Sequence, residues 1–354
     1  MEINVPGLLR IKKDAMHKIG KYVKQCGYSR IALICGEGIR QMFNTVLEIS
    51  FASSDVKVVF EFTASSNNLD DAFSCAKKIP KPVQAVVAIG GGKAIDFSKY
   101  VALINQLPVF SVPTLISNDG FASPFSSMLV DGKRKTIKTR IPDGVVVDTA
   151  IIAKTPERFI YSGMGDLFCK LTSTADWKLA YKKNGELVND FASTICINSV
   201  NTFAYYPHKD ITDCSYLGIM ISSLLMSGIA MEIAGSSRPA SGAEHMISHA
   251  YDSLCASDAS IKTSIHGLQV GTASYVMSFL QASSFESMKT IIAECGFASF
   301  MEKEPLNKKA FLEAVRRAPE VKEDYYTILS EKDSYDRVCE FIETDELARK
   351  MIQG

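Results

Sequence analysis

The first 150 residues alternate short apolar runs with helical patterns, and this alternation limits the possible folds more than any other feature of the chain. Four apolar runs read as strands, at residues 30–35, 56–62, 84–89 and 108–113. Strands separated by helices favour a parallel sheet with helices on both faces. Residues 1–154 are therefore expected to form an α/β nucleotide-binding domain of Rossmann-like type.

From about residue 155 the pattern becomes helical, and residues 155–354 are expected to form an all-α domain that binds metal and substrate. Residues 216–235 carry a single charge, Glu232, and are long enough to cross a bilayer. A central helix that is buried on all sides gives the same pattern. The serines within this segment favour the buried helix.

The charge balance argues against a nucleic-acid partner, because 39 basic residues offset 39 acidic ones and leave no basic footprint. The nine cysteines include no Cys-x-x-Cys pair, which suits reduced thiols in a cytosol. The first residues lack the basic and apolar blocks of a signal peptide. We expect a cytoplasmic protein with no membrane partner, and the sequence leaves open whether it forms a homo-oligomer.

Three glycines, Gly90, Gly91 and Gly92, stand between a predicted strand and a predicted helix. Glycine lets the backbone approach a pyrophosphate, and a helix N-terminus presents free N–H groups. Such a turn also occurs for conformational reasons alone, and the spacing of a P-loop is absent. With Lys93 and Asp96 behind the glycines, phosphate binding is the expected role.

Two further segments follow strand ends. Gly36 and Glu37 follow the first predicted strand, where a carboxylate could bind ribose hydroxyls and disfavour a 2′-phosphate; NAD against NADP stays open. The polar residues 114–124 follow the fourth strand, at the edge where ligands sit in open α/β sheets. A hairpin at 128–138 is expected to turn at Asp131-Gly132. Its basic residues are expected to form a solvated face, with phosphate attraction as the alternative.

Three of the five histidines lie between residues 236 and 266, namely His245, His249 and His266. The four-residue spacing of the first two stacks their imidazoles on one helix face, which suits a metal or a metal plus a substrate oxygen. Ser241 is a candidate N-cap for that helix. The alternative is that one histidine caps a helix and another is a hydrogen-bonded core residue. Asp166 is the best-placed acid to join them, or it complements a helix dipole.

Several segments together resemble the superfamily of iron-containing alcohol dehydrogenases, glycerol dehydrogenases and dehydroquinate synthase-like proteins. They are residues 90–96, 113–119 and 163–166 and the two histidine segments. Within it, residues 117–124, 132–135 and 236–245 are similar to the sn-glycerol-1-phosphate dehydrogenase branch. The resemblance spans roughly residues 10–290.

The resemblance implies a dehydroquinate synthase-like fold with a metal at the cleft between an N-terminal nucleotide-binding domain and a helical domain. By position, Asp166, His245 and His266 hold the metal, and His249 touches the substrate or lies behind the ligands. If the choice between His245 and His249 is wrong, the two exchange roles. The glycine turn would carry the pyrophosphate, and Asp119 and His249 would act on the substrate. The path from adenine to nicotinamide would be lined by Thr114, Ser117, Asp119, Ser123 and Phe125.

The implied reaction is reversible hydride transfer between NADH or NADPH and the C2 carbonyl of dihydroxyacetone phosphate, giving sn-glycerol 1-phosphate. Zinc is the favoured metal, and two imidazoles and a carboxylate also accept nickel or iron. We expect Arg238 to bind the substrate phosphate, or else to be a structural arginine. Rival functions are dehydrogenation of another polyol or phosphorylated sugar, and a dehydroquinate synthase-type cyclisation or lyase reaction. Enzymes of the dehydroquinate synthase type usually place glutamate where Asp166 stands.

Overall fold

The computed structural model describes residues 3–354, which divide into two compact units. The first comprises the chain up to Thr155 together with Asp210–Glu232, and the second comprises Pro156–Lys209 together with Ile233–Gly354. The sequence-based boundary after residue 154 stays a prediction for the functional domains. The contacts add that Asp210–Glu232 belongs with the α/β unit.

A six-stranded sheet forms the centre of the first unit, and every neighbouring pair of its strands is parallel, as expected. Its order is β1-β8-β5-β4-β2-β3. The bounds are β1 Leu8–Lys12, β2 Arg30–Gly36, β3 Lys57–Ala64, β4 Ala85–Gly90, β5 Val109–Pro113 and β8 Gly144–Asp148. Strands β2, β4, β5 and β8 are almost entirely buried, which explains why they read as continuous apolar runs.

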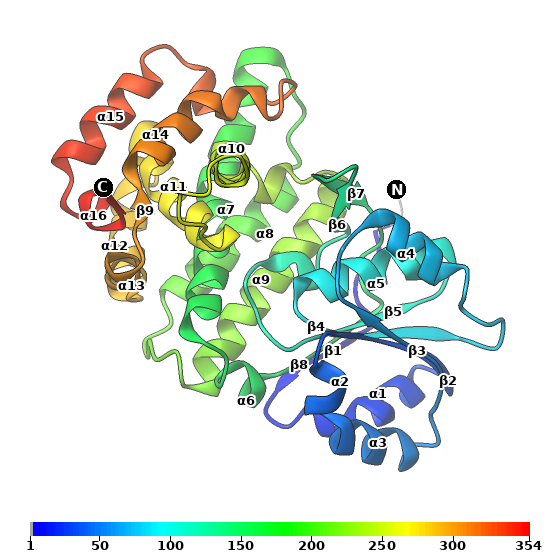
Figure 1. Ribbon diagram of the computed structural model, residues 1–354. Helices are drawn as coiled ribbons and strands as arrows, with labels where there is room; N and C mark the ends of the chain where they lie inside the picture. The colour runs from blue at the N-terminus through cyan, green and yellow to red at the C-terminus, as the bar shows by residue number, and fades with distance from the viewer. Residues whose placement is uncertain (1–2) are drawn as a thin grey trace. The chain divides into compact units, whose positions relative to one another are not determined.

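Helices cover both faces of this sheet: α1–α3 lie on one face, and α4 and α5 on the other (Figure 1). The helices of the unit are η1 Met16–Lys18, α1 Ile19–Gln25, α2 Ile39–Met42, α3 Asn44–Ala52, α4 Leu69–Ala76, α5 Gly92–Ile104, η2 Asp119–Phe121, α6 Thr149–Ile152 and α9 Cys214–Ala234. The strand–helix alternation therefore produces the predicted doubly covered sheet.

The predicted hairpin is present as β6 Phe125–Val130 and β7 Lys133–Lys138, which pair antiparallel. Asp131 and Gly132 connect the strands with φ of 52° and 72°, the left-handed pair that a two-residue turn of type I′ requires. The basic side chains of the hairpin are exposed at Lys133, Arg134, Lys135 and Lys138. This exposure favours the solvated face.

The second unit is built from helices, as expected for the helical domain. They are α7 Glu157–Asn184, α8 Asp190–Ala204, η3 Arg238–Ala240, α10 Ala243–Ser257, α11 His266–Gln281, α12 Phe285–Glu294, α13 Phe297–Lys303, α14 Lys308–Arg317, η4 Ala318–Glu320, η5 Ile328–Ser330, α15 Ser334–Thr344 and α16 Glu346–Met351. A two-residue parallel pair, β9 Leu306–Asn307 and β10 Ile352–Gln353, is its sheet. Helix α7 ends at Gly185, whose φ is 79°.

Helix α9 is long and apolar enough to cross a membrane, which among residues 3–354 is true of this helix alone. Buried residues make up 61% of its most apolar window. It packs closely on the loop before β6: a Cβ at Gly228 would lie 2.2 Å from the carbonyl oxygen of Ala122. These contacts favour the buried helix as the reason for its apolar surface.

Candidate nucleotide and metal sites

The topology of the sheet places the predicted cofactor glycines side by side. Strands β2 and β4 are neighbours, yet the chain leaves β2 toward β3 and leaves β4 toward β5 on the other side. Such a switch point opens a crevice at the carboxyl ends of the strands. Gly36 ends β2 and is followed directly by the exposed Glu37, and Gly90 ends β4. A Cβ at Gly90, where φ is 150°, would lie 3.1 Å from the backbone nitrogen of Gly36.

Helix α5 begins at Gly92, directly beside this crevice. A Cβ at Gly92 would meet no atom within 4 Å, and Lys93 is exposed. The glycine turn therefore presents an open helix N-terminus, the arrangement that suits a phosphate. Asp96 faces elsewhere: its carboxylate lies 3.1 Å from Nζ of Lys99 and accepts from the backbone N–H of Ser127. The cofactor role of Asp96 stays a prediction.

The buried Lys99 organises the polar loop that follows β5. Its ammonium donates to the carbonyl oxygens of Gly120 at 2.9 Å, Ser123 at 3.0 Å and Phe125. Thr114 and Ser123 are buried, Ser117 is partly buried, and the Asp119 carboxylate accepts from the Ser227 hydroxyl at 2.7 Å. Sequence reasoning missed Lys99; its place three residues after Asp96, on an apolar helix, was the available signal.

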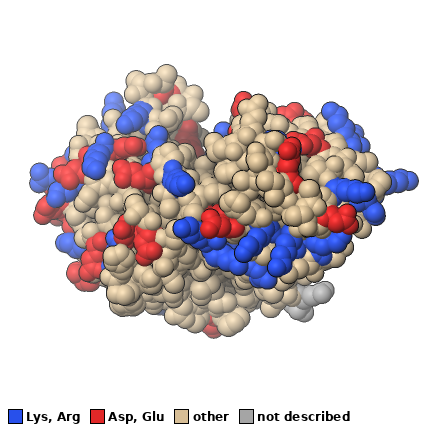
Figure 2. Space-filling view, turned by 90° about the horizontal axis from the view of Figure 1, so that it is seen from below, with Lys and Arg blue, Asp and Glu red and all other residues tan. Residues whose placement is uncertain are grey.

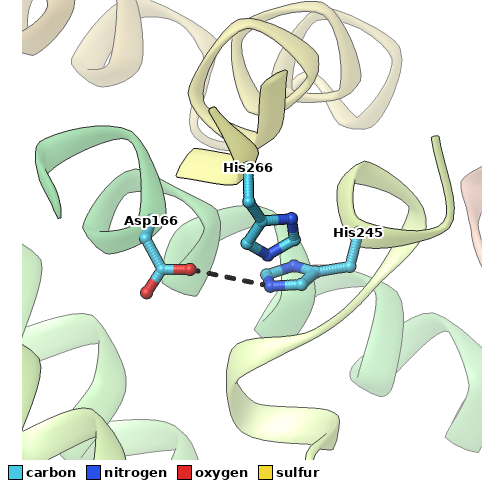
Figure 3. A group of neighbouring side chains, drawn as sticks. All are labelled: Asp166, His245 and His266. Atoms are coloured by element: carbon cyan, nitrogen blue, oxygen red, sulfur yellow. Dashed lines mark ion pairs between the residues drawn. The ribbon is translucent and has the colours of Figure 1, made fainter. Parts of the chain in front are cut away.

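Asp166, His245 and His266 lie together in the second unit, with one ligand atom of each within 4.8 Å of the others (Figure 3). They come from α7, α10 and the first residue of α11. Asp166 is buried in the middle of α7, which begins nine residues earlier at Glu157. The alternative that it complements a helix dipole is therefore wrong, since that effect is confined to the first turn.

Glycines let the helices that carry Asp166 and His266 touch through their backbones. A Cβ at Gly165 would lie 2.0 Å from the carbonyl oxygen of Gly267, and a Cβ at Gly267 would lie 2.0 Å from that of Ser162. Any side chain at either position would force α7 and α11 apart. Each glycine is the immediate neighbour of a candidate ligand, so this contact sets the spacing of the site.

The tautomer of His266 follows from its hydrogen bonds. The Ser248 hydroxyl donates to Oε1 of Gln269, whose amide nitrogen is fixed by Asp252 and the Ser264 carbonyl. Ser248 therefore accepts from Nδ1 of His266 at 2.8 Å. A proton on Nδ1 leaves the Nε2 lone pair unprotonated, which is the form that binds a metal.

His245 is oriented in the same way. Its Nδ1 lies 3.1 Å from Oε1 of the buried Glu244, while Nε2 faces Oδ1 of Asp166 at 3.7 Å. The other oxygen of Asp166 pairs with Lys170 at 3.2 Å. Burial opposes ionisation of Asp166, but Lys170 and His245 outweigh it and hold the pKa of that carboxyl below its usual range. The site thus contains a carboxylate and two imidazoles with directed Nε2 atoms.

This donor set fits a divalent transition metal. Three protein ligands of the oxygen and nitrogen type are the number that catalytic zinc sites use, which leaves positions for other ligands. A second cluster, Cys169, Glu244 and His245, shares one histidine with the first. Because its Glu244 oxygens already accept from Gly242, Thr172 and His245, the first cluster is the better candidate for a metal site.

The other predicted site residues of this unit, His249, Arg238 and Ser241, differ in what they contact. His249 is partly buried, and its ring stacks on that of His266 at 5.8 Å between centroids. Arg238 is buried and pairs through its Nε and Nη2 atoms with the Glu186 carboxylate, and its guanidinium lies over the Tyr325 ring. Such contacts favour the alternative in which Arg238 has a structural role. Ser241 is not the N-cap of α10: Gly242 has that place, and Ser241 accepts from Lys322 instead.

Replacing Glu244 with alanine is expected to weaken zinc binding about 10–100-fold, because the acceptor that fixes the His245 ring is lost. Glutamine at this position should recover most of the affinity, since its amide oxygen can still accept from Nδ1. Competition with a chelating dye measures this without any substrate. The exposed Glu302→Ala is the control. Equal zinc affinity of Glu244→Ala and the wild type would show that Glu244 does not orient the ring.

Comparison with known proteins gives the family. The iron-containing alcohol dehydrogenase family matches residues 10–156. A glycerol-1-phosphate dehydrogenase (NAD(P)+) of Thermofilum pendens is 30% identical, over 93% of this chain and 93% of that protein. The enzyme of the same name from Staphylothermus marinus is 32% identical, over 94% of this chain and 93% of that protein.

Solved structures agree at the level of the fold. Glycerol dehydrogenase from Schizosaccharomyces pombe superimposes with a TM-score of 0.78 at 19% identity, over 99% of this chain and 91% of that one. An iron-containing alcohol dehydrogenase from Thermotoga maritima has a TM-score of 0.66 at 14% identity, over 97% and 98%. With these two relatives matched over nearly their whole length, the chain belongs to the glycerol-1-phosphate dehydrogenase family within the iron-containing alcohol dehydrogenase superfamily.

Proposed function

We propose that the protein is a metal-dependent oxidoreductase that transfers hydride reversibly between NAD(P)H and C2 of dihydroxyacetone phosphate, with sn-glycerol 1-phosphate as the product. The observation that carries the proposal is the buried set of Asp166, His245 and His266, in which hydrogen bonds direct both Nε2 atoms. It occurs in a chain whose curated relatives are glycerol-1-phosphate dehydrogenases (NAD(P)+).

When bound, a divalent ion supplies Lewis-acid polarisation of the carbonyl, and the nicotinamide supplies the hydride. Asp166, His245 and His266 hold the ion, while Glu244 and Ser248 keep protons on the Nδ1 atoms. Reduction also adds a proton to the C2 oxygen. We assign its delivery to His249, which lies one helical turn after His245.

The other assignments rest on placement. The crevice beside β2 and β4 is the proposed pyrophosphate site, and Glu37 the proposed ribose contact. The proposed cofactor residues are Gly36, Glu37, Gly90, Gly91, Gly92, Lys93, Asp96, Thr114, Ser117, Asp119, Ser123 and Phe125. Asp119 is also a proposed substrate contact. Arg238 remains a proposed phosphate ligand only if its pair with Glu186 opens.

We further propose that the protein is a cytoplasmic enzyme that acts on a small phosphorylated substrate and binds neither nucleic acid nor a membrane. A homo-oligomer is compatible with this proposal.

On the face in Figure 2, Lys and Arg side chains gather in one band, while elsewhere Asp and Glu lie among them. A groove on the unit that contains α1 is lined by Lys18, Lys21 and Lys24 with Ser53 and Ser54. Asp55 pairs with Lys24 beside it at 3.1 Å.

Metal removal and reconstitution test the function. Protein stripped of metal should not oxidise NADH or NADPH with dihydroxyacetone phosphate, and added zinc, nickel or iron should restore the reaction. Absorbance at 340 nm, a property of the reduced nicotinamide, follows the rate, and unphosphorylated dihydroxyacetone is the control substrate. No turnover of dihydroxyacetone phosphate by protein with bound metal and nucleotide would reject this substrate. The other polyols, the sugar phosphates and the cyclase reaction would then be tested.

A further inference from the structure

The turn after η4 carries a partly buried lysine, Lys322, that lacks a carboxylate partner. Nζ of Lys322 lies 3.2 Å from the hydroxyl of Ser241, which is its hydrogen-bond partner. No carboxylate within residues 3–354 forms an ion pair with it at 4.0 Å or less. Burial and, next, the neighbouring Arg238 together lower the pKa of Lys322 to about 8, although Glu244 opposes this shift. A buried cation without a counter-ion is costly unless an anion joins it.

A second cation shares the same aromatic ring but is already neutralised. Arg238 and Lys322 lie over Tyr325 at 3.7 Å and 4.4 Å from the ring centroid. The Glu186 carboxylate forms an ion pair with the Arg238 guanidinium. The pair of cations therefore has one carboxylate in direct contact, and the ammonium of Lys322 is the charge left without one.

The position of Ser241 connects this cation to the metal site. Ser241 lies four residues before His245 in the chain, in the extended segment that leads into α10. Its segment is fixed to α7 because the Cys169 thiol donates to the Ala240 carbonyl and the Ser173 hydroxyl donates to that of Pro239. The 15-residue helix α10, which carries His245, begins at Ala243, two residues after Ser241.

We propose that Lys322 and the Ser241 hydroxyl bind the phosphate group of the substrate. This inference rests on the proposed function and names the residues that select a phosphorylated substrate. It places the phosphate contact on Lys322, because Arg238 is occupied by Glu186.

The test compares Lys322→Met with Lys322→Arg and with the exposed control Lys332→Met, each in metal-loaded protein. Lys322→Met should raise KM for dihydroxyacetone phosphate about 10–100-fold, since a charge-assisted contact is lost. KM for NADH should change less than about twofold, and arginine should restore part of the affinity. Competitive inhibition by inorganic phosphate should weaken by the same factor. An unchanged KM for the ketone, or an equal rise in both KM values, would overturn the proposal.

Two further measurements keep the test decisive. If Lys322→Met does not fold, Ser241→Ala should raise the same KM about tenfold while leaving KM for NADH unchanged. If the wild type does not turn over dihydroxyacetone phosphate, the proposed function fails, and inorganic phosphate then tests the site alone. Phosphate should raise the Tm of the wild type but not that of Lys322→Met. Absence of protection in both proteins would reject the site.

Discussion

Replacing His266 with alanine is expected to lower metal-dependent turnover roughly 1,000-fold or more. Loss of a neighbour that merely orients a ligand costs about 10–100-fold in metal affinity, and the loss of a ligand itself should exceed that. The ion contributes several kcal/mol of transition-state stabilisation, and each 1.4 kcal/mol is a factor of ten in rate. The measurements are metal content after dialysis and kcat/KM for dihydroxyacetone phosphate.

The matched control is the exposed His208→Ala, in the same unit, which should keep full metal content and rate. NADH affinity, followed by the fluorescence of the reduced nicotinamide, should be unchanged in both variants because the proposed nucleotide residues belong to the other unit. A His266→Ala protein that retained stoichiometric metal and wild-type turnover would remove this residue from the ligand set. The same experiment with His249→Ala decides between the two histidines of α10 that could exchange roles.

Replacing Lys99 with methionine is expected to destabilise the α/β unit by about 3–5 kcal/mol, since it leaves the buried Asp96 without its counter-charge and three loop carbonyls without a donor. For a unit of this size the change corresponds to a fall in Tm on the order of 10 °C. Scanning calorimetry measures it, and NADH affinity should fall with it because the loop supplies the proposed cofactor residues.

The double variant Asp96→Asn/Lys99→Met should recover part of the lost stability, because no uncompensated charge stays buried. The exposed Lys81→Met is the control for losing a lysine in this unit. A wild-type Tm for the single variant would show that the ammonium adds nothing to the net stability of the loop. Lys99 would then not be needed to position the loop that follows β5.

Much of the fold could be predicted because the apolar runs and glycine turns are local signals. The four apolar runs predicted as strands and the Asp131-Gly132 turn are present in the structure. β1 was missed because Leu8–Lys12 is half exposed at the sheet edge and alternates weakly. The grouping of α9 with the α/β unit was also missed, since the partner of an evenly apolar helix cannot be read from its pattern.

The candidate metal ligands could be proposed from the histidine cluster and the family resemblance, whereas the groups that orient them could not. Glu244 and Ser248 stand beside or between the histidines, but only the fold shows which nitrogen each one contacts. Lys99 and Lys322 were missed because a lysine is normally exposed, and the position of Lys99 after Asp96 on an apolar helix is only a weak signal of burial. Asp166 was expected near a helix start because Gly163 and Gly165 imitate a break. In the structure both glycines lie inside α7, and Gly165 is a point of contact with α11.

The backbone contact between α7 and α11 also affects how this site can change during evolution. Where side chains separate two helices, a neutral exchange of one core residue for another shifts the ligands they carry, and metal geometry drifts with the core. Here the backbone carbonyl groups of Ser162 and Gly267 are the closest contacts and act as the spacer between the two helices. Surrounding core residues can therefore vary while the distance from Asp166 to His266 is kept. The two glycines are the positions at which this freedom ends.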